Sequence, residues 1–133
     1  MTVPRQYHTE QIHYLFKTFN YNDPGISTSP GVTMDAKLPK NCIPLPLTVF
    51  VETAFNAGTT NTLTIGDNTT ANRFAQTGDT TLGTVGFYIN INRNTTRPAT
   101  DLDVYLLYAQ TGAAATAGKA TVIFPFVPDQ TQY

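Results

Sequence analysis

The feature that most constrains this chain is the two-residue period of apolar residues in the segments 45–53 and 61–66. The apolar residues of segment 45–53 share one parity: Leu45, Leu47, Val49 and Val51. Segment 61–66 repeats the pattern with Leu63 and Ile65. A two-residue period of this kind is that of a strand buried on one face. We expect the two segments to form a hairpin of an antiparallel β protein, joined by a long polar loop.

Other parts of the chain show the same alternation. Five further strand segments are bounded by turn residues: 12–19, 32–38, 84–92, 101–109 and 119–127. The cleanest of them, 84–92, predicts that Val85, Phe87, Ile89 and Ile91 face the core. Pro125 lies inside the last segment, and because proline cannot donate to a strand ladder, we expect 119–127 to be an edge strand.

The long polar connection at 67–83 contains only two large apolar residues, Phe74 and Leu82. Connections of this length without structure are uncommon in compact domains. It either holds a short helical turn at 70–75 or crosses from one sheet to the other with Phe74 as its anchor.

The strand pattern and the chain length predict one all-β domain. A chain of 133 residues can bury a single sizeable core, and no segment shows the 3.6-residue apolar spacing of a helix. We therefore predict a single antiparallel β-sandwich or jelly-roll-like domain over 12–127. An extended N-terminal arm (1–11) precedes it and a C-terminal tail (128–133) follows it.

Composition argues against several classes of protein. Charged residues make up 13% of the chain, against about 25% in typical domains, and 24 threonines supply much of the polar surface. The net charge of −1 lacks the basic patch of a nucleic-acid-binding protein. With neither a signal peptide nor a membrane-spanning stretch in view, we expect synthesis in the cytoplasm and no membrane contact.

Residues suited to catalysis or metal binding do not converge in the sequence. Cys42 is the only cysteine, which excludes an intrachain disulfide, and it is better interpreted as a small buried residue than as a nucleophile. His8 and His13 fall on opposite faces of an extended chain. Asp101 and Asp103 could hold a cation or act as a carboxylate pair, but a solvated strand end explains them more simply. We expect no enzyme activity, no cofactor and no metal site.

Seven residues are candidates for an interface. Four aromatic residues lie on the parity opposite the dominant apolar face: Phe19, Phe50, Tyr88 and Tyr105. They are either covered by loops or form a contact surface, since aromatic residues are enriched in interface cores. The terminal segments add Arg5, Tyr7 and Tyr133, which are of types that anchor interfaces.

The order of these segments resembles a family of viral proteins. The run Glu52-Thr53-Ala54-Phe55-Asn56, the following Thr-Leu-Thr-Ile-Gly-Asp strand, the later GFYINI strand and the closing ATVIFPFV strand are similar to those of the small all-β decoration, or cement, proteins of tailed-phage heads. The likeness covers roughly residues 12–127.

The resemblance implies a non-enzymatic virion protein on the outer surface of the capsid. Such a protein binds the assembled head as a homo-oligomer, a dimer or a trimer, and braces neighbouring major capsid subunits. The alternative is a receptor- or carbohydrate-binding module of a fibre or tail, because similar sandwiches occur there. The absence of Trp weighs against a sugar-stacking surface, although Tyr can substitute.

Overall fold

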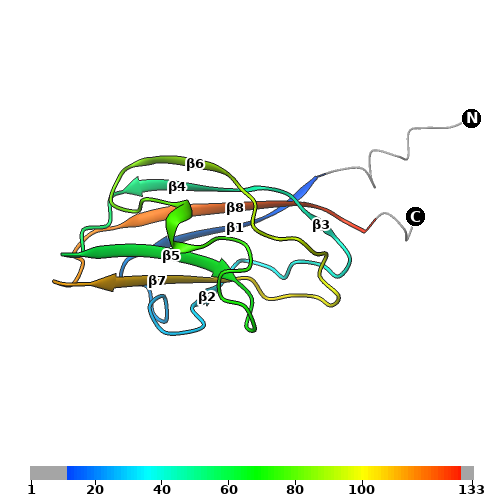
Figure 1. Ribbon diagram of the computed structural model, residues 1–133, viewed down its shortest axis with the longest axis horizontal. Helices are drawn as coiled ribbons and strands as arrows, with labels where there is room; N and C mark the ends of the chain where they lie inside the picture. Colours follow the sequence, from blue (N-terminus) through cyan, green and yellow to red (C-terminus); the bar gives the residue numbers. More distant parts are fainter. Residues whose placement is uncertain (1–11, 130–133) are drawn as a thin grey trace, which may run out of the picture.

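In the computed structural model, which describes residues 12–129, two antiparallel sheets face each other across a shared core (Figure 1). The larger sheet has the order β1-β8-β4-β6, with β3 pairing with one end of β8: β1 (His13–Asn20), β8 (Lys119–Val127), β4 (Leu47–Thr53), β6 (Gly86–Ile91) and β3 (Ile43–Pro44). The smaller sheet has the order β2-β7-β5: β2 (Val32–Thr33), β7 (Tyr105–Thr111) and β5 (Thr60–Gly66). A single turn of 3₁₀ helix, η1 (Thr77–Asp79), is the only helix among the described residues, and it is too short to span a membrane.

The path of the chain is that of a jelly roll. From β4 to β8, each strand lies in the sheet opposite the strand before it. Successive strands therefore build the two layers together, as in jelly-roll sandwiches. The predicted fold class, an all-β antiparallel sandwich, is confirmed.

The core lies between the two sheets. Phe55 is buried there, with its ring centroid 5.6 Å from that of Phe19 and 4.9 Å from that of Tyr108. Phe74 packs edge-on against Phe124, with the two ring centroids 4.9 Å apart. The predicted inward residues of the last strand are all buried: Ala120, Val122, Phe124 and Phe126.

The predicted hairpin between 45–53 and 61–66 is wrong. The two strands exist as β4 and β5, but β4 pairs with β6 and β8, whereas β5 pairs with β7 in the other sheet. Leu63 and Ile65 are buried as predicted, because alternation reports which residues face a core. Alternation does not report which strand lies alongside.

The predicted strand at 32–38 forms only in part. Pairing with β7 covers Val32 and Thr33, and a single bridge joins Leu38 to Leu102. The long connection after β5 behaves as one of the two alternatives predicted: it crosses to the larger sheet, and Phe74 is buried with 1% exposure. The helical turn lies at η1 rather than at 70–75.

The prediction that 119–127 is an edge strand is also wrong, because β8 lies between β1 and β4. Pro125 is tolerated there because of a break in the neighbouring chain. Its carbonyl accepts a hydrogen bond from the backbone N–H of Leu45, in the segment that separates β3 from β4. Since the N and C=O of one strand residue point to the same side, the missing N–H faces this break rather than a continuous ladder.

The inward face predicted for 84–92 is wrong for three of its four residues. Ile91 is buried, but Val85, Phe87 and Ile89 are 56%, 70% and 63% exposed. The cause is a β-bulge: between the pairs Leu47–Ile91 and Val49–Tyr88, β6 advances one residue more than β4. An extra residue moves every later side chain to the opposite face.

Candidate functional site

One surface of the larger sheet carries the exposed apolar side chains of the described region. We call the surface that points away from the smaller sheet the outer face, defined by the outward residues of its strands: Tyr14, Phe16 and Thr18; Thr121, Ile123 and Pro125; Thr48 and Phe50; Phe87 and Ile89. Figure 1 shows β6, β4, β8 and β1 forming one layer, with β5 and β7 beneath it. No other described strand layer covers this face.

All eight exposed large apolar side chains among residues 12–129 lie on the outer face or extend it. Five belong to the face itself: Tyr14, Phe16, Phe87, Ile89 and Ile123. Ile12 and Val85 precede β1 and β6 with the outward parity, and Ile43 pairs with Val127, two positions from Pro125 on the same face. The largest contiguous apolar patch on a protein surface is often a site of interaction.

Two aromatic residues form one half of a row that crosses this face. Thr18, Thr121 and Phe50 are cross-strand partners in register, and Phe50 is also paired with Phe87. The rings of Phe50 and Phe87 stack with their centroids 4.4 Å apart. The hydroxyls of Thr18 and Thr121 hydrogen-bond to each other at 2.8 Å. Few hydrogen-bonding groups of this row are therefore left for a partner.

The outer face is nearly free of charge. Among the outward residues of its described strands, the charges are those of Glu52 and Lys119 at one end, 3.3 Å apart. Both side chains are about half exposed, so this ion pair contributes little to stability. The rest of the face offers aromatic, aliphatic and hydroxyl groups.

The structure separates the four aromatic residues predicted from parity. Phe50 lies on the outer face of the larger sheet and Tyr105 on the outward side of the smaller one. The surface placement of Phe19 is wrong: it is fully buried, because it shares the inward parity of Leu15 on β1. Tyr88 is also misplaced, since it packs against the core beyond the β6 bulge.

The hydroxyl of Tyr88 donates to the backbone carbonyls of Thr81 and Thr84, at 2.8 and 2.9 Å. Tyr88 is therefore a brace between β6 and the end of the preceding connection. The candidates Arg5, Tyr7 and Tyr133 lie outside the described residues.

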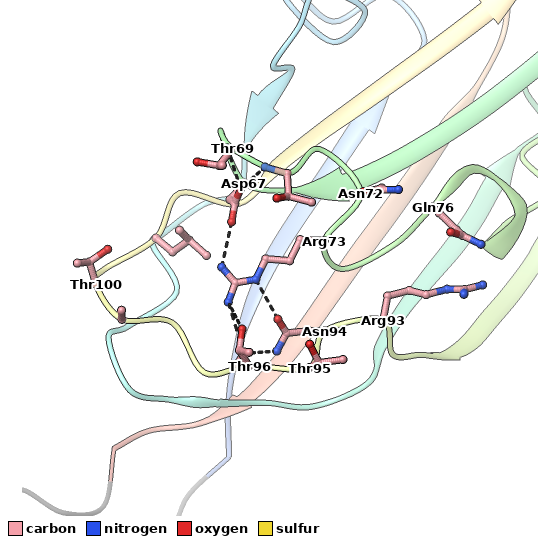
Figure 2. A pocket seen from close by; sticks show the side chains of 13 residues that line it. Asp67, Thr69, Asn72, Arg73, Gln76, Arg93, Asn94, Thr95, Thr96 and Thr100 are labelled. Atoms are coloured by element: carbon pink, nitrogen blue, oxygen red, sulfur yellow. Dashed lines mark hydrogen bonds and ion pairs between the residues drawn. The ribbon is translucent and has the colours of Figure 1, made fainter.

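A second feature is an open polar pocket of about 730 Å³ at one end of the sandwich. Its walls are the connection after β5 and the loop after β6 (Figure 2). Figure 2 shows the guanidinium of Arg73 between these two segments. It donates to Asp67 at 2.9 Å, to the side-chain oxygen of Asn94 at 2.9 Å and to the hydroxyl of Thr96 at 3.1 Å.

The Asp67 carboxylate is the other half of this arrangement. It accepts hydrogen bonds from the backbone N–H groups of Thr69 and Thr70, at 2.8 and 2.6 Å, and from Arg73. Burial alone raises the pKa of Asp67, but the Thr70 N–H and the Arg73 guanidinium outweigh it, so the pKa is lowered from its usual value. Arg73 and Asp67 thus satisfy each other and fix the turn that begins the connection.

A similar contact closes the other side of the pocket. Arg93 reaches both carboxylate oxygens of Asp79, at 2.6 and 3.0 Å. This hydrogen bond, together with the N–H of Gln76, lowers the pKa of Asp79. Because both arginines bind carboxylates of the chain itself, the pocket is interpreted as a structural clasp between two loops rather than a site for an anion.

Other residues considered for chemistry are accounted for by local contacts. Cys42 is fully buried, and burial raises its pKa to about 11, so the thiol is protonated at neutral pH. Asp101 accepts from the N–H of Lys40 at 2.9 Å, and Asp103 lies 3.7 Å from the Lys37 ammonium. Within residues 12–129, no group of three His, Cys, Asp or Glu side chains is placed to hold a metal ion.

Sequence reasoning missed most of the outer face. Tyr14 and Phe16 share a face with Ile12 in the sequence pattern, but no pattern said that this face is exposed. The signal that could have identified it is the presence of large apolar residues on both parities of one strand. In β1, Tyr14 and Phe16 take one parity while Leu15 and Phe19 take the other, which is typical of a strand covered on both faces.

Comparison with known proteins gives one structural neighbour. No family model matches the chain, and no curated protein matches it. A chain in the solved structure described as the cyanophage Pam1 capsid asymmetric unit is similar, with a TM-score of 0.67 and 19% sequence identity. The superposition covers 96% of this chain and 93% of that one. At this identity the likeness shows a shared fold over nearly the whole length of both chains.

Proposed function

We propose that this protein is a structural component of a phage capsid, and specifically a decoration protein. It binds the outer surface of the assembled head and stabilises contacts between major capsid subunits. The observation that carries the proposal is the end-to-end structural likeness to a chain of a cyanophage capsid. The likeness extends along nearly the full length of both chains rather than over a short shared segment.

The site geometry supports a role in binding rather than in catalysis. The described residues present a broad apolar face, while the acidic and basic groups of the pocket are bound to one another. A general acid or base needs a titratable group free to exchange a proton with a substrate. The structure thus favours a protein that works by surface burial, which is the work of a non-enzymatic virion component.

The terminal segments are proposed to contact the capsid. Arg5 and Tyr7 in the arm (1–11) and Tyr133 in the tail (128–133) are residue types that often dominate interface energies. The arm continues from β1 and the tail from β8, which are neighbours in the larger sheet. Both segments therefore leave the sandwich on adjacent strands, at the end where His13 pairs with Phe126, so they can reach one site on a shell together.

The proposal is tested with heads from which the decoration protein has been removed. Purified full-length chain is added, the heads are sedimented, and bound copies are counted by quantitative gel or mass spectrometry. We expect saturation at a fixed number of copies per head and a higher temperature of head rupture. Deleting residues 2–11 or 128–133 is expected to lower occupancy and to leave the melting temperature of the free protein nearly unchanged.

Two results would contradict parts of this proposal. Full occupancy with both deletions would mean that the arms are not the capsid contact. Failure of the full chain to bind heads, combined with binding to a glycan array or host-cell surface, would favour the alternative of a fibre or tail module.

A further inference from the structure

We infer that the outer face of the larger sheet is the contact between two copies of this chain, which pack face to face about a twofold axis. The proposed function implies a homo-oligomer. This inference names the surface that joins its subunits, and in that respect it rests on the proposed function. It assigns the contact to a surface that is distinct from the proposed capsid-binding arms.

The outer face has about the area of a small specific interface. Four strands about 4.8 Å apart, each about seven residues long at about 3.4 Å per residue, give a footprint of about 450 Å². Two such faces in contact remove about 900 Å² of flat area, and more once the relief of the side chains is counted; specific interfaces begin near 1,000 Å². Ile12, Ile43 and Val85 extend the apolar surface at its margins.

Charge favours a second copy over a partner of different chemistry. A strongly acidic or basic partner finds nothing complementary on this face, whose Glu52 and Lys119 neutralise each other. Two identical faces meet without like-charge repulsion, which would cost free energy at an interface. Phe50 and Ile123 lie on the two inner strands, β4 and β8, and Phe87 stacks on Phe50 from the edge strand β6. All three are of the aromatic and aliphatic types found in homodimer cores.

The strand edges of the larger sheet are obstructed, which leaves the face as the route to association. On β1, the N–H of Phe16 donates to the Asp35 carboxylate at 2.9 Å, and the N–H of Asp35 donates to the Phe16 carbonyl at 3.4 Å. On β6, the bulge at Asn90, with φ of 59°, interrupts the edge. Blocked and bulged edges resist the addition of another strand.

Symmetry follows from the presence of one such face. In a twofold interface the same patch serves on both subunits, whereas a ring needs two different complementary patches. The outward side of the smaller sheet carries Thr62, Thr64 and Ala109, of which Thr62 and Ala109 are cross-strand partners. None of the large exposed apolar residues lies on that side. The arrangement that covers Phe87 with another apolar surface is therefore the outer face against itself, with the two sheets about 10 Å apart.

The test is the mass of the full-length chain in solution, measured by sedimentation velocity from 0.5 to 100 µM. We expect the wild type at twice the 14.5 kDa chain mass. The double variant Phe16→Glu/Phe87→Glu is expected at the monomer mass, with the affinity of dimerisation lowered at least 100-fold. Tyr105→Glu/Leu107→Glu is the matched control, because it introduces the same two charges at outward positions of the smaller sheet, and it should remain dimeric.

Hydroxyl-radical footprinting provides a second readout that needs no variant to fold. Tyr14, Phe16 and Phe87 should be oxidised several-fold less at 100 µM than at concentrations where the chain is monomeric, while Tyr105 should not change. A monomeric or trimeric wild type overturns the inference, as does an unprotected outer face in a dimer. Head binding plays no part in these readouts: a dimer that fails to bind heads contradicts only the proposed function, and a monomer that binds heads contradicts only this inference.

Discussion

At the scale of single residues, Arg73 has the most consequential contacts in the molecule. Its side chain is four-fifths buried, and its guanidinium joins the loops that precede and follow β6. We expect Arg73→Leu to lower the free energy of unfolding by about 3 kcal/mol, because it leaves the buried Asp67 charge without its partner. Arg73→Lys should recover part of the loss, since it keeps the charge but not the fork of donors. Urea melts measure both; equal loss in the two variants would contradict this role.

Asp67 makes the stability depend on pH. Because its pKa in the folded protein is lowered from the usual 3.8, its stabilising contribution is complete above that value and is lost as the pH falls through the folded pKa. The wild type should therefore exceed Asp67→Asn in stability at pH 6, and the difference should shrink below about pH 4. Asp103→Asn, which alters an exposed ion pair, is the control. A difference that stays constant from pH 6 to pH 2.5 would argue against the assignment.

Phe87 and Phe124 are a matched pair for locating the core. Phe124 is 1% exposed and Phe87 is 70% exposed. We expect Phe124→Ala to cost about 3–5 kcal/mol through cavity formation. Phe87→Ala should cost less than about 1 kcal/mol when measured at concentrations where the chain is monomeric, because its side chain is mostly hydrated there. A large loss at Phe87 under these conditions would show that its face is covered within one chain.

At the scale of elements, the bulge in β6 decides which side chains form the core and which form the outer face. Asn90 takes a positive φ, a conformation that Asn and Gly tolerate and β-branched residues do not. Asn90→Gly is expected to be nearly neutral, whereas Asn90→Val should cost about 1–3 kcal/mol. Thermal melts of both variants test this, and an unaffected Asn90→Val would mean that the bulge is not where the register changes.

The same bulge shows how far sequence reasoning extends in this chain. Strand positions and the buried parity of β4, β5, β7 and β8 follow from alternation, which local sequence encodes. The assignment of strands to sheets does not, since it depends on contacts distant in sequence. The residues of β6 were assigned to the wrong face because one extra residue inverts the parity that the pattern predicts. Tyr88 was misplaced by the same bulge. Phe19 was misplaced for another reason: both parities of β1 carry large apolar residues.

At the scale of the whole molecule, different regions have different roles. The clasp of Arg73 and Arg93 holds the long loops at one end of the sandwich. The outer face is proposed to join two copies, and the terminal segments are proposed to reach the capsid. Many copies on one shell would add avidity to contacts that are individually modest, so the proposed role requires no single strong contact.

The central claim is that this chain decorates the outside of a phage head, and a difference map tests it most directly. Cryo-electron microscopy of heads with and without the bound protein should show added density on the outer surface, over the contacts between major capsid subunits. That density should accommodate the two-sheet sandwich at repeated, symmetry-related positions. Absence of added density on the head, or added density confined to the tail or fibres, would contradict the account.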